Sequence, residues 1–240
     1  MKNIAVIIPA YNEEKNILKL IKRLKNLLPK SKIYIIDDSP GDKTKFLIDR
    51  EKINYYHRKK KLGRGSAVLY GMKKTYFSNK YNIFIEMDAD LSHNPNELIK
   101  NINYFKKNKL DLLVASRYLK KSRIINWPIS RKILSFLSNY LASLLLKLPV
   151  TDYTNGFRIY SKRAVRKIIN NCGKIGDGFI ILSEILLVLH ISKYKINEVS
   201  SVFINRVRGE SSVNLKLIFF SFLGLLNLFF KKNKYIIPIK

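Results

Sequence analysis

The sequence is short of cysteines, acidic residues and long apolar runs, and each shortage excludes a class of protein. Cys172 is the only cysteine, so an intramolecular disulfide and a cysteine-based metal site are both excluded. This composition fits a reducing compartment. Pro9 ends the first apolar run after about half a dozen residues, which is too short for the core of a signal peptide. The three histidines have no metal-ligand spacing and are expected to be structural or solvated, and only His93 lies near the site predicted below.

Acidic residues are scarce: 17 Asp and Glu face 46 Lys and Arg, which gives a formal net charge of +29. Such a charge requires an acidic partner, and nucleic acid, an anionic membrane surface or phosphorylated substrates would each serve. The chain has 240 residues, of which 47% are apolar, so it can form one large domain with a core. The sequence contains neither an internal repeat nor a long linker.

The stretch YNIFIEMDADLSHNP combines a short strand with two closely spaced carboxylates. Residues 83–87 are apolar except for one glutamate, which is typical of a buried strand. Asp88 and Asp90 follow directly, and Asn94-Pro95 predicts a helix start. Two acids this close repel each other unless a cation lies between them, and Mg²⁺ or Mn²⁺ prefers oxygen ligands. The stretch therefore predicts a divalent metal site; the alternative is a solvated acidic turn.

Short apolar runs alternate with helical patterns in the first half of the chain. Further strands are predicted at 4–8, 33–36, 53–57 and 110–115. This βαβ alternation predicts an α/β fold with a mostly parallel sheet flanked by helices. Ligands bind at the carboxyl edge of such sheets, where the acidic residues that follow the strands would lie.

A basic loop, RKKKLGRG, precedes a predicted helix. Backbone N–H groups at a helix start can hold phosphate when a basic side chain such as Lys61 is near. The spacing matches neither a P-loop nor a dinucleotide fingerprint. The alternative is a basic loop whose glycines, Gly63 and Gly65, serve helix packing.

Two strongly apolar helices are predicted in the second half, at about 133–148 and 215–230. Each is shorter than the roughly 20 residues that a spanning helix needs. Basic residues flank both, so we expect amphipathic helices that lie in a membrane interface; core or dimer helices are the alternative. The predicted organisation is a domain at 1–214, followed by an apolar membrane-associated helix and basic tail at 215–240.

Eight motifs occur in order along the chain: IIPAYNEEKNI, IIDDSPGDKT, KLGRGSAVLYG, MDADLSHNP, ASRY, DYTNGFRIY, GFIILSEILL and NRVRGESS. Together they resemble the family-2 inverting glycosyltransferases and, more narrowly, the polyprenol-phosphate (dolichol-phosphate) mannosyltransferases. No single motif is specific, but eight in this order are, and they cover residues 3 to 214. The resemblance implies a GT-A-type nucleotide-binding sheet, a sugar-nucleotide donor and a lipid-phosphate acceptor.

The same resemblance implies roles for residues at matching positions. Those expected to hold the nucleoside are Pro9, Tyr11, Glu13 and Asp38. Those expected to bind the metal and the donor diphosphate are Asp88 and Asp90, with Ser92 as a third metal contact. Arginines near the sugar and phosphates match Arg117 and Arg131, and one that meets the lipid phosphate matches Arg206. Catalysis is therefore expected to depend on Asp90, Arg117, Arg131 and Arg206.

The chain departs from the family pattern at three places. The order Ser-Pro-Gly-Asp-Lys-Thr at 39–44 replaces the usual Ser-Pro-Asp-Gly-Thr, and Asn155 replaces a serine. Ser212 stands where many members have lysine, which removes one expected contact to the acceptor phosphate.

The expected reaction is transfer of mannose from GDP-mannose to a polyprenyl (dolichyl) phosphate with inversion, at the cytoplasmic face of a membrane. The alternative within the enzyme class is transfer from UDP-glucose or a UDP-N-acetylhexosamine to the same lipid. A non-enzymatic nucleic-acid or membrane binder would explain the charge, but nucleic acid would be repelled by acid pairs that lack a metal. We therefore expect an anionic membrane surface, and no nucleic acid, as the partner.

Overall fold

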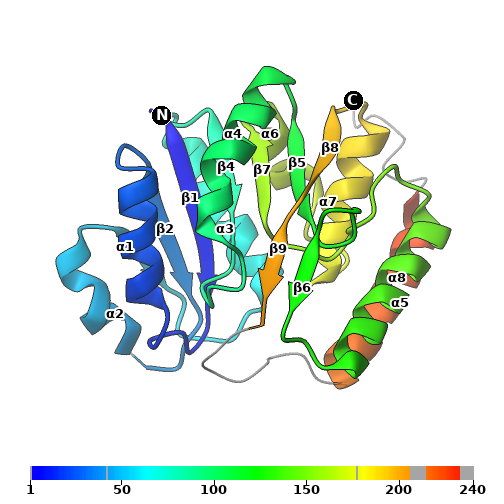
Figure 1. Cartoon of the computed structure of the whole chain (residues 1–240), viewed down its shortest axis with the longest axis horizontal. Helices are drawn as coiled ribbons and strands as arrows, with labels where there is room; N and C mark the ends of the chain where they lie inside the picture. Colours follow the sequence, from blue (N-terminus) through cyan, green and yellow to red (C-terminus); the bar gives the residue numbers. More distant parts are fainter. Residues whose placement is uncertain (1, 42, 177, 206–214, 233–240) are drawn as a thin grey trace.

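The computed structural model describes residues 2–41, 43–176, 178–205 and 215–232, and its centre is a seven-stranded sheet (Figure 1). The strands run in the order β3-β2-β1-β4-β7-β5-β8. Their bounds are β1 Ile4–Ala10, β2 Lys32–Asp37, β3 Asn54–His57, β4 Ile83–Glu86, β5 Leu112–Ser116, β7 Arg158–Ser161 and β8 Ile196–Ser200. All neighbouring strands pair in parallel except β7, which is antiparallel to β4 and β5. The predicted α/β fold with a mostly parallel sheet is confirmed.

Helices cover both faces of the sheet (Figure 1). One face is covered by α1 (Ile17–Leu27) and α4 (Leu98–Lys107), and the other by α3 (Arg64–Phe77), α6 (Lys162–Asn171) and α7 (Ile180–Ile191). A short helix, α2 (Lys43–Ile48), and two 3-10 turns, η1 (Asp49–Glu51) and η2 (Pro95–Glu97), complete this part. As predicted, Asn94 caps the turn at Pro95.

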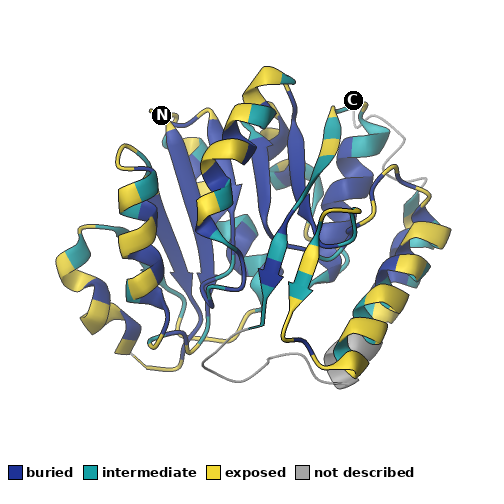
Figure 2. Ribbon diagram, in the orientation of Figure 1, coloured by how far each residue is buried: buried dark blue, intermediate teal, exposed yellow. Residues whose placement is uncertain are grey.

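The sheet separates two hydrophobic cores because side chains alternate along each strand. In β1, Ile4, Val6 and Ile8 face the core under α1 and α4, whereas Ala5 and Ile7 face the core under α3. Strands buried on both faces read as continuous apolar runs, which explains why the sequence predicted them well. Figure 2 shows the buried strands between helices whose outer faces are exposed.

Two strand predictions were incomplete. No strand was predicted at β7, which is inserted between β4 and β5. The segment EVSSVFINRVRGESSVN alternates like a single strand in the sequence, but the structure has a break at Ser201 between β8 and β9 (Val202–Ile204). Strand β9 pairs with β6 (Arg123–Ile125) in a second, two-stranded sheet. The carboxylate of Glu97 holds this break, because it accepts hydrogen bonds from the Ser201 hydroxyl at 2.6 Å and the Val202 N–H at 2.9 Å.

Two apolar helices, α5 (Ile129–Leu146) and α8 (Leu215–Lys231), lie side by side at one edge of the molecule (Figure 1). The structure confirms both as helices, and α5 starts earlier than predicted because Pro128 sets its first turn. Large apolar side chains remain exposed on them: Ile129, Ile133, Phe136, Leu137, Tyr140, Leu144, Phe222, Leu223 and Phe230. Within the described ranges, none of the helices is both long and apolar enough to span a membrane.

Candidate active site

Three parallel neighbours, β2, β1 and β4, end at the same edge of the sheet, and most of the predicted site residues follow these ends. Asp88 and Asp90 lie just after β4, as predicted. The Asp90 side chain is buried and accepts a hydrogen bond at 3.0 Å from the Ser92 N–H. The Asp88 side chain is 26% exposed. The alternative of a fully solvated acidic turn is therefore wrong, because the fold encloses most of this pair.

Arg64, the first residue of α3, supplies a cation to this acidic group. Its Nη1 donates to Glu86 Oε1 at 2.7 Å, and its Nε donates to Asp88 Oδ1 at 2.8 Å. Tyr160 donates to the other oxygen of Glu86 at 2.6 Å. Burial alone would lower the pKa of Arg64, but the two carboxylates outweigh it and hold that pKa above its ordinary value. Arg64 and Glu86 were missed from sequence, although a glutamate inside an apolar strand was a usable signal.

Gly156 makes room for this arginine. A Cβ at that position would lie 1.8 Å from Arg64 Nη2, which is closer than atoms can approach. A larger residue at this position would therefore displace the guanidinium from its place beside the two carboxylates.

His93 anchors the loop that carries the two aspartates, and it is buried rather than solvated. Its Nδ1 accepts the Asp88 N–H at 3.0 Å, and its Nε2 lies 2.9 Å from Asn155 Oδ1. Because Nδ1 is an acceptor, Nε2 must carry the proton and donate it to Asn155. Asn155 in turn donates to the Ala115 carbonyl. Asn155, which replaces the serine of the family pattern, thus has a hydrogen-bond partner, His93, on the loop that carries the two aspartates.

The donor atoms at this loop fit Mg²⁺ or Mn²⁺. Ser92 is buried, and its Oγ has no hydrogen-bond partner among the residues that the structure describes. With Asp88 and Asp90 it offers hard oxygen ligands, and metal binding by these three residues stays a prediction. No cluster of three or more His, Cys, Asp or Glu side chains suited to a metal exists in the described ranges. Mg²⁺ is commonly held by one or two carboxylates together with substrate phosphates, so two aspartates suffice.

The residues predicted to hold a nucleoside lie at the ends of β1 and β2. Pro9 is within β1, and the Tyr11 ring lies 4.3 Å from the ammonium of Lys61, which joins the basic loop to this edge. Glu13 is buried and accepts from the Asn16 side chain at 2.8 Å. These residues lie near the same edge of the sheet, and nucleoside binding by them stays a prediction.

Asp38 forms an ion pair that was not predicted from the sequence. Arg58 donates to both of its oxygens, with 2.7 Å between Arg58 Nη2 and Asp38 Oδ2. The Leu62 N–H donates to the same oxygen at 2.9 Å. Asp38 therefore ties down the basic loop, whatever else it binds.

Arg117 is fully paired with a carboxylate. Its Nε and Nη2 donate to the two oxygens of Asp152 at 2.8 and 2.7 Å, and Nη2 also donates to the Thr154 hydroxyl. Burial alone would lower the pKa of Arg117, but Asp152 outweighs it and raises that pKa. The same pairing lowers the pKa of Asp152 against the opposing effect of burial. The pair fixes the orientation of Arg117.

Arg131, in the first turn of α5, donates to Asn205 at 2.9 Å and lies 4.2 Å above the Trp127 ring. Arg206, together with Ser212, lies outside the described residues. Trp127 and Asp152 were missed from sequence, and Asp152 lies 35 residues along the chain from its partner Arg117.

A cavity of about 320 Å³ lies between the aspartate loop and the two arginines. Four predicted residues line it: Asp88, Asp90, Arg117 and Arg131. Apolar side chains of α5, α7 and α8 form much of the remaining wall, including Leu134, Leu137, Leu141, Ile180, Phe222 and Leu225. The cavity therefore has a charged end at the sheet and an apolar end between the helices.

Comparison with known proteins agrees with this geometry. Residues 5–169 match glycosyl transferase family 2. An undecaprenyl-phosphate mannosyltransferase of Micrococcus luteus is 30% identical over 88% of this chain and 87% of its own length. A dolichol-phosphate mannosyltransferase of Pyrococcus furiosus is 34% identical over 90% of this chain but only 60% of its own length.

Solved structures share the fold at lower identity. Glucosyl-3-phosphoglycerate synthase of Mycobacterium tuberculosis, solved with Mn²⁺, UDP and glucosyl-3-phosphoglycerate, superposes with a TM-score of 0.69 at 16% identity. The match covers 97% of this chain and 80% of the synthase. The sheet is thus the expected GT-A type, and the chain is a glycosyltransferase that belongs to glycosyl transferase family 2.

Proposed function

We propose that this protein transfers mannose from GDP-mannose to a polyprenyl phosphate, with inversion at the anomeric carbon. The observation that carries the proposal is the cavity with two unlike ends. Its charged end has the groups needed to hold phosphates and a metal, and its apolar end suits an isoprenoid chain. The names of the relatives in Micrococcus luteus and Pyrococcus furiosus support the same acceptor and sugar.

The acceptor in this proposal is an ionised phosphate monoester, which is already a nucleophile at neutral pH. The protein therefore needs no strong general base and has two other tasks. It must hold two anions together, and Arg117 and Arg131 offset their repulsion by charge-assisted hydrogen bonds. Arg206 is proposed to contribute in the same way.

The second task is to stabilise the departing nucleoside diphosphate. Asp88, Asp90 and Ser92 would hold Mg²⁺ or Mn²⁺, which when bound neutralises the leaving phosphates. The proposed nucleoside site consists of Pro9, Tyr11, Glu13, Asp38 and Lys61. Attack in line with the departing diphosphate inverts the anomeric centre.

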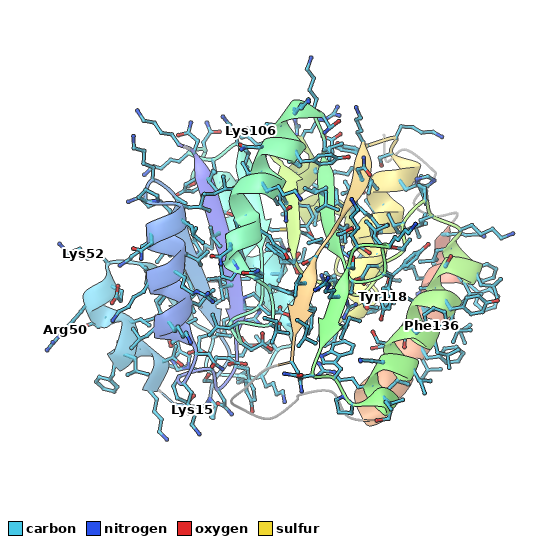
Figure 3. The ribbon with its side chains drawn as sticks, viewed as in Figure 1. Lys15, Arg50, Lys52, Lys106, Tyr118 and Phe136 are labelled. Atoms are coloured by element: carbon cyan, nitrogen blue, oxygen red, sulfur yellow. The ribbon has the colours of Figure 1, made fainter. Side chains whose placement is uncertain are left out.

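The exposed apolar face of α5 and α8 is proposed to lie on an anionic membrane surface at its cytoplasmic side. Phe136 on α5 is 61% exposed, and its ring centre lies 6.4 Å from that of Tyr118, whose hydroxyl donates to Ser135 at 2.6 Å (Figure 3). Apolar contact and basic residues act together in interfacial binding. The division into a domain at 1–214 and a membrane-associated segment at 215–240 belongs to this proposal.

The test is direct transfer. The purified chain, with Mg²⁺ or Mn²⁺ and a polyprenyl phosphate in detergent, receives GDP-mannose, UDP-glucose or UDP-N-acetylglucosamine, each radiolabelled in its sugar. Labelled lipid from GDP-mannose alone is the expected result. Labelled lipid from a UDP-sugar alone would replace the donor but keep the acceptor. Hydrolysis without labelled lipid would overturn the acceptor assignment.

A further inference from the structure

Trp127 is the only tryptophan of the chain, and a local turn directs it into the protein. Asn126 before it has φ of 60°, a left-handed conformation that asparagine tolerates well, and Pro128 after it starts α5. As a result Trp127 is only 6% exposed, whereas Ile125 and Ile129 on either side are 38% and 75% exposed. Without this turn, Trp127 would point to the same side as Ile125, because side chains alternate along a strand.

The Trp127 ring lies near two arginines at the wall of the cavity. The guanidinium carbons of Arg131 and Arg117 are 4.2 and 5.6 Å from its centre. Phe203 packs edge-on at 5.1 Å and fixes the ring. Asp152 and Asn205 hold the two arginines, so the cations stay beside the ring.

The indole N–H of Trp127 is buried without a hydrogen-bond partner in the described part of the chain. In these ranges the Oγ of Ser92 shares this property, and Arg64 Nη2 also makes no hydrogen bond, although it lies 2.7 Å from Asp88 Oδ1 in an ion pair. Both residues contact the aspartate pair. Buried N–H groups are rarely left unpaired in native proteins. Since an indole N–H can only donate, the missing partner is an acceptor, and two flanking cations favour an anionic one.

We propose that the Trp127 indole N–H donates a hydrogen bond to a phosphate oxygen of the lipid acceptor, which Arg117 and Arg131 also hold. This inference rests on the proposed function. The donor diphosphate is assigned to Asp88 and Asp90, whereas Trp127 leads directly into α5, whose leucines line the apolar end of the cavity. The first turn of α5 has no side-chain cap, so its backbone N–H groups also favour an anion here.

The experiment uses the full chain labelled with ¹⁵N-tryptophan, which gives a single indole cross-peak because there is one tryptophan. Citronellyl phosphate should shift this peak downfield, and citronellol should not. GDP-mannose with Mg²⁺ alone should leave it in place. Trp127→Phe, which keeps an aromatic ring but removes the N–H, should raise the KM for citronellyl phosphate about tenfold and leave the KM for GDP-mannose unchanged.

Each other outcome overturns the proposal in a distinct way. A shift caused by GDP-mannose but not by citronellyl phosphate would assign the N–H to the donor. A stationary peak, or an unchanged acceptor KM in Trp127→Phe, while the wild type still transfers sugar to lipid phosphate, would reject Trp127 and keep the proposed function. Absence of lipid product from the wild type with every donor would reject the proposed function itself.

Discussion

At the scale of single residues, buried charges near the cavity are paired with opposite charges. Arg64 forms ion pairs with Glu86 and Asp88, and Arg117 forms one with Asp152. Ionised groups that leave water need such partners, and the removal of one partner leaves the other charge buried and uncompensated.

Arg64→Met tests the first group. Glu86 is fully buried, so this variant should lose about 3–5 kcal/mol of unfolding free energy in urea titrations. The matched control is Lys25→Met, which removes a more exposed ion pair with Glu51 and should cost less than about 1 kcal/mol. Similar losses in the two variants would contradict a buried structural role for Arg64.

Asp90→Asn tests the proposed metal ligand. The substitution keeps the shape of the side chain and an oxygen for the Ser92 N–H, so the melting temperature should stay close to that of the wild type. Transfer should fall at least about 100-fold, because the charge that would hold the cation is lost. Near-normal turnover at saturating Mg²⁺ would rule out the metal assignment.

Asp152→Asn tests the Arg117 pair through pH. The pKa of Asp152 is lowered in the folded state, so the ionised carboxylate contributes stability above its unfolded pKa of about 4. That contribution disappears as pH falls from about 4 through the lower, folded value. The variant should therefore be less stable than the wild type at pH 7, and the difference should shrink in acid.

Asp111→Asn is the matched control for this variant. Asp111 also has a lowered pKa, opposed by burial and caused chiefly by Arg163, but it lies away from the cavity lining. Asp111→Asn should also lose the acid dependence of folding stability, but it should retain transfer. Asp152→Asn should lose the acid dependence of stability and should also impair transfer. Equal transfer by the two variants would show that the orientation of Arg117 is unimportant.

At the scale of elements, helices α5 and α8 have two unlike sides. Their inner sides line the apolar end of the cavity, and their outer sides expose large apolar residues. Gly224 lets α8 approach α7 closely, since a Cβ there would lie 2.9 Å from Ile180. The pair is therefore packed onto the domain while its outer face stays open.

Phe136→Ser tests the outer face. The proposal places Phe136 in a membrane interface, so its loss should weaken vesicle binding about tenfold or more. Folding stability should change by less than about 0.5 kcal/mol, because the residue is 61% exposed. Phe77→Ser on α3 is the control, since Phe77 is 74% exposed on another helix. Equal losses in vesicle co-sedimentation would contradict a specific role for α5.

The whole molecule carries a charge of +29, which is spread over many exposed lysines (Figure 3). Each basic residue near an anionic leaflet contributes roughly 1 kcal/mol, and salt screens this attraction. Binding to vesicles rich in anionic lipid should therefore fall steeply between about 0.1 M and about 1 M NaCl, as co-sedimentation would measure. Binding to neutral vesicles that is equally tight would show that the apolar helices dominate. Nucleic acid retained through purification without donor binding would favour the non-enzymatic alternative.

The sequence by itself determined the fold class, the strands β1 to β5, the apolar helices and the aspartates after β4. These features depend on apolar periodicity and turn residues that are close together along the chain. The motif order identified the family for the same reason, because it is read directly from consecutive residues.

Only the tertiary structure decided which side chains meet. It inserted β7 between β4 and β5, and it brought together residues 24 positions apart in Arg64 and Asp88, 35 apart in Arg117 and Asp152, and 62 apart in His93 and Asn155. Such pairs leave no local pattern, since their interaction energy arises only when folding excludes water from a shared cavity. The physical reason is that neighbouring residues determine local conformation, whereas burial in the folded protein determines which distant side chains interact.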